Sequence, residues 1–133
     1  HHKDGSVGKF THNIVNFPLT EDGYHTDVEK TRYLVRALKP KLMIFGKSLF
    51  LHPEPVREVH ELVKDWDDPP ILHYDMAHVL GLVGPHFQQP FADGADFVTG
   101  STHKTFFGSQ RGVMLTPGTD EDLNKTLDKG VFP

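Results

Sequence analysis

Two side chains in the middle of the chain could carry chemistry together. Asp75 follows the largely apolar run 71–74, and Lys104 comes shortly after the run 97–99. Both runs have the length and composition of strands, so we expect the carboxylate and the amine just beyond two strand ends. In a parallel sheet such ends lie at one edge, which is where α/β proteins bind their ligands.

A carboxylate and a lysine at such an edge could hold a pyridine ring between them. Pyridoxal phosphate needs this pairing, because a lysine amine forms the Schiff base and an anion keeps the ring nitrogen protonated. The alternative is a solvated ion pair between Asp75 and Lys104, the more common arrangement for such residues at strand ends. The residue types alone leave both interpretations open.

Two other motifs fail at one or two positions. The run 5–9 is similar to a phosphate loop, but Lys3 stands where its first glycine belongs and Phe10 where its hydroxyl residue belongs. We therefore expect a simple turn there. His60-Glu61 begins like a zinc-protease helix, but Lys64 stands where the second histidine is required.

Metal and dinucleotide sites are not expected either. The ten histidines show no recurrent ligand spacing, and the chain contains no cysteine. The run 81–84 lacks the glycine spacing and the preceding strand of a dinucleotide-binding fingerprint.

The elements that must position Asp75 and Lys104 alternate between strands and amphipathic helices. A capping box at Thr26 and Glu29 predicts a helix that runs to Pro40, and a second apolar stripe predicts a helix from Glu54 to Trp66. Strands are expected at 13–17, 42–45, 71–74, 97–99 and 113–115. The uninterrupted apolar run 42–45 is typical of a parallel strand covered on both faces. This alternation predicts an α/β fold with a mainly parallel sheet.

Composition narrows the class of protein. With 133 residues, 37% of them hydrophobic and 24% charged, the chain fits one globular domain. Its formal charge of -4 argues against binding to nucleic acid or to a membrane surface. We find no leader and no long apolar run, so we expect a cytoplasmic protein.

The two ends indicate a fragment. The chain opens on His1-His2 without a methionine and stops at 131–133, where we expect a loop that leads into a further segment. His1-His2 could be the remnant of a purification tag and is left out of functional reasoning.

An ordered set of motifs resembles the signature of the serine hydroxymethyltransferases. It consists of Asp75-Met76-Ala77-His78, Gly81-Leu82-Val83, Thr102-His103-Lys104-Thr105 and Arg111-Gly112. Further matches are Lys39-Pro40-Lys41-Leu42, Gly46 with Ser48, and Val131-Phe132-Pro133, so the resemblance spans almost the whole chain.

The resemblance implies a fold and a place within it. The fold would be the three-layer α-β-α large domain of fold-type I pyridoxal-phosphate enzymes, with a mainly parallel sheet in which the strand 113–115 runs antiparallel. Residues 1–133 would be the central part of this cofactor-binding domain, and the N-terminal and C-terminal parts of the enzyme would be absent.

The resemblance also implies roles for individual residues. Lys104 would form the Schiff base with pyridoxal 5'-phosphate, and Asp75 would pair with the pyridinium nitrogen. His78 would lie near the ring hydroxyl or the substrate carboxylate, and Ser48 would add a hydrogen bond in the same region. For His78 and Ser48 the alternative is a local structural role.

Three neighbours of the lysine and one arginine complete the set. His103 would either tune proton transfer or serve packing, and Ser101 and Thr102 correspond to threonines near the cofactor. Arg111 aligns with a family arginine whose role here is left open.

The activity implied is hydroxymethyl or aldol-type transfer on glycine, serine or another β-hydroxy amino acid. Tetrahydrofolate is a candidate co-substrate, and the intact enzyme is expected to be a homodimer or homotetramer, while the isolated segment is expected to be inactive. Departures from the family pattern at 49–52, 100–101 and 106–110 resemble a divergent branch that includes threonine transaldolases. A threonine aldolase or transaldolase is therefore the first alternative. A catalytically silent fragment or interaction domain is the second.

Overall fold

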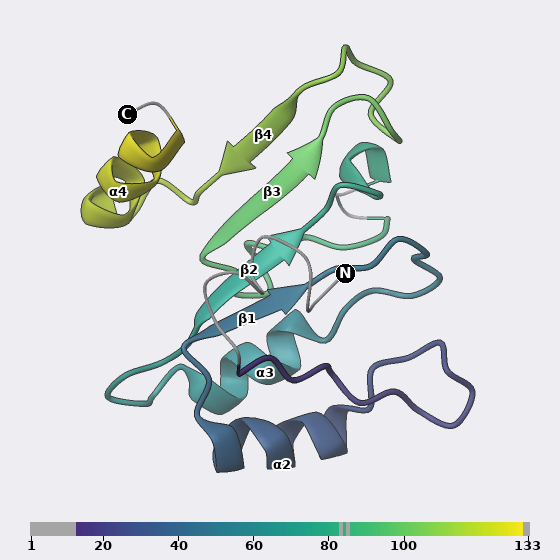
Figure 1. Ribbon diagram of the computed structural model, residues 1–133, viewed down its shortest axis with the longest axis vertical. Coiled ribbons are helices and arrows are strands. Elements are labelled where there is room, and N and C mark those ends of the chain that lie inside the picture. Colours follow the sequence, from purple (N-terminus) through teal and green to yellow (C-terminus); the bar gives the residue numbers. More distant parts are fainter. Residues whose placement is uncertain (1–12, 83, 85, 132–133) are drawn as a thin grey trace.

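A four-stranded mixed sheet forms the centre of the computed structural model, which describes residues 13–82, 84 and 86–131 (Figure 1). The strand order follows the chain: β1 (Leu42–Phe45), β2 (Ile71–Asp75), β3 (Phe97–Ser101) and β4 (Gly112–Leu115). The first three strands are parallel, and β4 runs antiparallel to β3. The α/β class, the mainly parallel sheet and the reversed last strand are thus confirmed.

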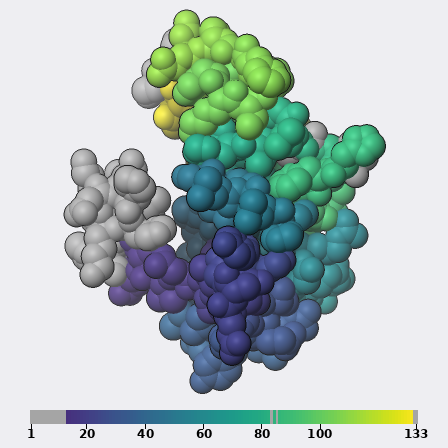
Figure 2. Space-filling model, turned by 90° about the vertical axis from the view of Figure 1, so that its right-hand side faces the viewer, coloured from purple at the N-terminus to yellow at the C-terminus, as the bar shows by residue number. Residues whose placement is uncertain are grey.

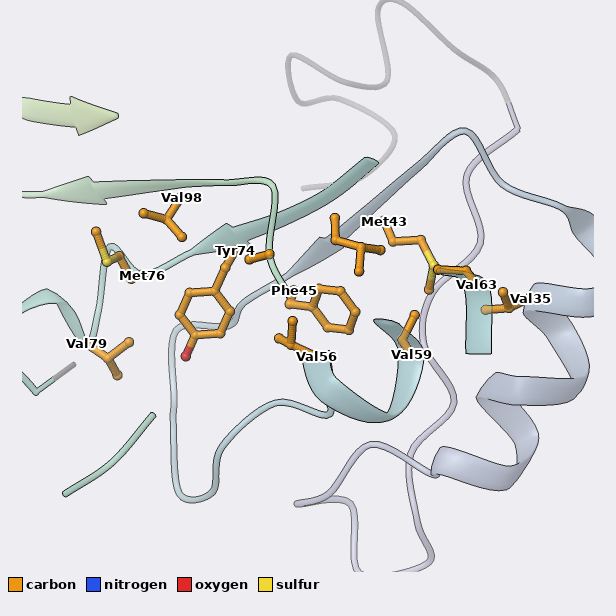
Figure 3. Close-up of a cluster of buried hydrophobic side chains, with 12 residues drawn as sticks. Val35, Met43, Phe45, Val56, Val59, Val63, Tyr74, Met76, Val79 and Val98 are labelled. Carbon is orange, nitrogen blue, oxygen red and sulfur yellow. The ribbon is translucent and has the colours of Figure 1, made fainter. Parts of the chain in front are cut away.

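Two helices cover one face of this sheet. The helix α2 (Val28–Leu38) precedes β1, and α3 (Val56–Val63) connects β1 to β2. Figure 3 shows side chains of alternate strand positions pointing toward these helices. The buried core consists of Val35, Met43, Phe45, Val56, Val59, Val63, Leu72, Tyr74, Met76, Val79, Ala95 and Val98.

The strands alternate between buried and more exposed positions. In β1, Met43 and Phe45 are buried, whereas Leu42 is 43% exposed and Ile44 is half-buried. The prediction that 42–45 is covered on both faces was wrong for the described residues, because the helices there pack on one side only. The opposite face of β2 carries His73 and Asp75.

The first helix begins one residue later than the capping box predicted. Asp27 is its N-cap, and the Asp27 carboxylate accepts a hydrogen bond of 2.9 Å from the Lys30 N–H. The Thr26 hydroxyl instead donates to Glu54 at 3.2 Å. At the other end Lys39 takes a left-handed conformation and its N–H donates to the Val35 carbonyl, so the helix stops before Pro40 as predicted.

The second helix is shorter than the predicted span of 54–66. It runs over 56–63 with Pro55 as the N-cap, and its three valines are buried. Leu62 and Trp66 are partly buried against the same core. The apolar stripe was therefore predicted correctly, although Trp66 lies in the turn that follows the helix.

Other expectations about the chain ends were wrong or lie outside the described residues. The segment 13–17 forms no strand, and Phe17 packs on Phe45 at a ring distance of 5.1 Å. Val131 is the last residue of a helix, α4 (Glu121–Val131), and not part of a loop. The turn at 5–9, the pair His1-His2, Val83 and the final two residues lie outside the described residues.

Candidate active site

The carboxyl ends of β1, β2 and β3 lie at the same edge of the sheet (Figure 1). Ser48 follows β1, Asp75 is the last residue of β2, and Lys104 follows β3 by three residues. Figure 2 shows the segments after β3, β2 and β1 in succession from top to bottom of one side of the molecule. The topology therefore brings the sequence-predicted residues to one region.

A glycine brings the end of β1 close to Asp75. Gly46 has a φ of 142°, and a Cβ atom on it would lie 2.5 Å from the Asp75 carbonyl oxygen. Only glycine fits this close approach without a shift of the backbone. The segment that carries Ser48 is thereby held against the end of β2.

Asp75 has one carboxylate oxygen engaged. Its Oδ1 accepts a hydrogen bond of 3.0 Å from the Ala77 N–H, which fixes the orientation of the half-buried side chain. Among the hydrogen bonds and ion pairs of the described residues, none involves Asp75 Oδ2. This second oxygen can accept a hydrogen bond from a donor group of a ligand.

Lys104 points toward the segment that follows Asp75. Its Nζ lies 3.3 Å from Nε2 of His78, so a neutral His78 protonated on Nδ1 can accept a hydrogen bond from the amine. The Gly81 N–H donates to the Thr105 hydroxyl at 3.3 Å, and a Cβ on Gly81 would collide with the Thr105 carbonyl. These contacts join the segments after β2 and β3.

Asp75 and Lys104 form no ion pair with each other within the part of the chain that the structure describes. The acid and the amine lie at neighbouring strand ends, with separate partners. The direct ion pair that the sequence left open is therefore not seen among these residues.

The remaining sequence-predicted residues occupy different environments. Thr102 Oγ1 lies 2.5 Å from the Ser109 carbonyl and 3.1 Å from the Arg111 carbonyl, so this hydroxyl closes the loop between β3 and β4. The Arg111 guanidinium donates to the carbonyl of the preceding residue at 2.9 Å. Ser101 is half-buried at the end of β3, and Ser48 and His103 are exposed.

Sequence reasoning missed a histidine beside the proposed acid. Nε2 of His73 lies 2.8 Å from the Thr99 hydroxyl, and its ring stacks on Phe97 at 4.4 Å with an interplanar angle of 6°. Burial lowers the pKa of His73, and the negative charge of Asp75 opposes this shift. The two-residue spacing from Asp75 on a strand is the signal that could have revealed it.

A buried amide beneath the site was missed as well. The Gln88 side chain accepts from the Glu54 N–H at 2.9 Å and from the Tyr74 hydroxyl at 3.0 Å. It donates to the Glu54 carbonyl at 2.7 Å and to Asp93 at 3.0 Å. Burial raises the pKa of Tyr74, and the charges of Glu54 and Asp93 add to this shift. Gln88 thus links the residue before Asp75 to the segment that starts α3.

Metal-binding clusters and membrane-spanning helices are both absent from the described residues. No group of three or more histidine, cysteine, aspartate or glutamate side chains could hold a metal ion there. None of the helices in these ranges has the length and apolar character needed to cross a membrane.

Comparison with known proteins gives one consistent family. The family model described as serine hydroxymethyltransferase matches residues 1–133. A serine hydroxymethyltransferase of Methanosphaera stadtmanae is 44% identical over 121 residues, which are 90% of this chain and 28% of the relative. That of Thermococcus gammatolerans is 41% identical over 132 residues, 97% of this chain and 30% of the relative. The chain spans less than a third of the length of these relatives.

Proposed function

The chain belongs to the serine hydroxymethyltransferase family, and from this premise we propose that the protein carrying it is a pyridoxal-phosphate-dependent transferase. Its substrates would be glycine, serine or another β-hydroxy amino acid, and the reaction a hydroxymethyl or aldol-type transfer at the α-carbon. Residues 1–133 would be the central part of the cofactor-binding domain. Tetrahydrofolate would be the one-carbon acceptor.

The observation that carries this proposal is the pair of uncommitted groups at neighbouring strand ends. Asp75 is oriented by the Ala77 N–H and keeps Oδ2 without a partner among the described residues. Lys104 is exposed, and its Nζ lies 3.3 Å from Nε2 of His78. An anion and an amine that do not neutralise each other fit a cofactor that needs one at its ring nitrogen and the other at its aldehyde carbon.

When bound, pyridoxal phosphate supplies an electron sink for the charge that develops at the substrate α-carbon. Asp75 would hold the proton on the ring nitrogen through a charge-assisted hydrogen bond. Lys104 would provide the covalent attachment. His78 would accept a proton from the Lys104 Nζ, because its Nε2 lies within hydrogen-bond distance of that amine.

The other site residues would serve orientation. Ser48 would donate a hydrogen bond from the segment that Gly46 holds against Asp75. Ser101 and Thr102 would shape the path from β3 to Lys104, with the Thr102 hydroxyl closing the following loop. His103 would tune proton transfer next to the lysine.

A specific observation favours the alternative of aldol or transaldol chemistry. Phe107 is 94% exposed and Leu49 is 82% exposed, and both lie in segments that follow the strand ends of the site. Contact with apolar surface gains roughly 25 cal/mol per Å² removed from water, so a bulky apolar aldehyde would benefit. A threonine transaldolase is therefore the second candidate.

Activity of the intact protein separates the two candidates. It would be supplied with L-serine and tetrahydrofolate, and separately with L-threonine and an aromatic aldehyde, while glycine and new β-hydroxy amino acid are measured. We expect folate-dependent release of glycine from serine. An aldehyde-dependent product from threonine, with serine inert, would replace the first candidate by the second, and inactivity in both reactions would favour a silent domain. The cytoplasmic location and the homodimer or homotetramer remain predictions.

A further inference from the structure

His73 shares a strand face with the proposed acid and is linked to the same neighbouring strand. It lies two residues before Asp75 in β2, so both side chains leave the sheet on the same side. Its Nε2 lies 2.8 Å from the hydroxyl of Thr99, and Thr99 is the register partner of Asp75. The imidazole is therefore fixed directly behind the carboxylate along the strand.

Among the described residues, Asp75 is the charge that acts on His73. Its register partners are Ile44 in β1 and Phe97 in β3, and neither of these strands contains a titratable side chain. Asp96, just before β3, accepts a hydrogen bond through Oδ2 from the Leu72 N–H at 2.7 Å and is not among the groups that shift the pKa of His73. Burial lowers the pKa of His73, and the charge of Asp75 is what raises it.

We propose that His73 is a positioning residue whose own protonation is coupled to occupancy of the ring-nitrogen subsite at Asp75. This inference rests on the proposed function, since it requires a pyridinium nitrogen at that carboxylate. A neutral His73 leaves the negative charge of Asp75 available to the ring. A protonated His73 interacts with the negative charge of Asp75 and so competes with the ring nitrogen for it.

The coupling must act equally in both directions. A cationic ring nitrogen paired with Asp75 cancels the negative charge that favours the imidazolium, so ligand binding lowers the pKa of His73 further. By linkage, protonation of His73 weakens ligand binding by the same factor. Because burial already lowers this pKa, the imidazole is neutral at neutral pH, and the weakening is confined to more acidic solution.

Pyridoxamine phosphate is a suitable probe because it carries the same ring nitrogen but no aldehyde that could react with Lys104. Its dissociation constant for the intact protein would be measured between about pH 5 and pH 8. The affinity for pyridoxamine phosphate should fall at acid pH in the parent, and this fall should be about fivefold smaller in His73→Gln. The reason is that the glutamine amide can still donate to Thr99 but carries no charge. His86→Gln, which changes an exposed histidine, is the matched control and should behave as the parent.

A second measurement does not depend on the folding of that variant. In protein with ¹³C-labelled histidine, the His73 resonance is identified by its displacement in Thr99→Val. Its pKa should fall when pyridoxamine phosphate binds, and in Asp75→Asn without ligand. An unchanged His73 pKa on binding, or an acid dependence identical in parent and His73→Gln, overturns the inference. Failure of the probe to bind at any pH counts against the proposed function itself.

Discussion

The orientation of Asp75 follows from a single backbone contact. The Ala77 N–H holds one carboxylate oxygen at 3.0 Å, and the other has no partner among the described residues. An isosteric amide at this position would keep the shape of the side chain but lose its charge. A substitution at this residue can therefore separate binding of the cofactor from withdrawal of electrons by its ring.

Asp75→Asn should allow cofactor attachment at Lys104 while slowing removal of the substrate α-proton by two or more orders of magnitude, on the order of the contribution of one well-placed electrostatic group. The reason is that a neutral amide does not stabilise a protonated ring nitrogen. Exchange of the glycine α-proton in deuterated water measures this step. Asp65→Asn, at an exposed position after α3, is the control. Exchange at the parental rate in Asp75→Asn would show that the carboxylate does not have the assigned role.

Close contacts at the carboxyl ends of the strands stabilise the sheet in addition to the hydrogen bonds between the strands. Gly46 lets the segment after β1 approach the Asp75 carbonyl, and Gln88 joins the end of β2 to the start of α3. Each contact can be tested by a substitution that should lower stability more than the same substitution at a control position.

Gly46→Ala should destabilise the protein by roughly 1 to 3 kcal/mol or more, because it adds a side chain at a φ of 142° and places its Cβ against backbone. Gly23→Ala is the control, since Gly23 also has a positive φ, 73°, but has nothing within 4 Å of an added Cβ. Urea denaturation measures both. Equal losses in the two variants would mean that conformation alone, and not the approach to Asp75, requires the glycine.

Gln88→Leu should cost roughly 2 to 5 kcal/mol, because it leaves buried partners in Glu54 and Tyr74 without hydrogen bonds. The adjacent Gln89 is exposed, so Gln89→Leu should change stability by less than about 0.5 kcal/mol. Thermal and urea unfolding of the three proteins provide the comparison. A Gln88→Leu protein as stable as the parent would show that the network contributes no net stabilisation.

The sequence predicted those elements in which the apolar residues are the ones that pack in the core. The β1 and β2 runs and the valines of α3 are apolar because they pack in one core, so their periodicity was sufficient. The helix cap was misassigned because Thr26 and Asp27 are both good cap residues, and a distant contact with Glu54 engages the threonine. Helix α4 was missed although Leu123, Leu127 and Val131 recur in it at helical spacing, and none of its residues is buried.

The candidate site was predictable to a similar degree. Strand ends placed Asp75 and Lys104 at one edge, but the specific roles came from the family resemblance. The contacts of His73 and Gln88 could not be foreseen, because they depend on strand register and on the path of the loop that carries Gln88.

The chain as a whole holds its site residues on a sheet with one packed face. The helices α2 and α3 support the core behind β1, while Asp75 and His73 lie on the opposite side of β2. The relatives are more than three times as long as the matched segment, so this chain corresponds to less than a third of each of them. The proposed attachment of the cofactor involves a lysine within this segment.

The most direct measurement is therefore the location of that attachment. The intact protein would be incubated with pyridoxal phosphate, reduced with borohydride and digested, and the labelled lysine identified by mass spectrometry. We predict the phosphopyridoxyl group on Lys104, its loss in Lys104→Ala, and its retention in Lys47→Ala, where the replaced amine is ion-paired with Glu54 at 2.6 Å. A label on Lys41 or Lys47, with Lys104 unmodified, would contradict the account.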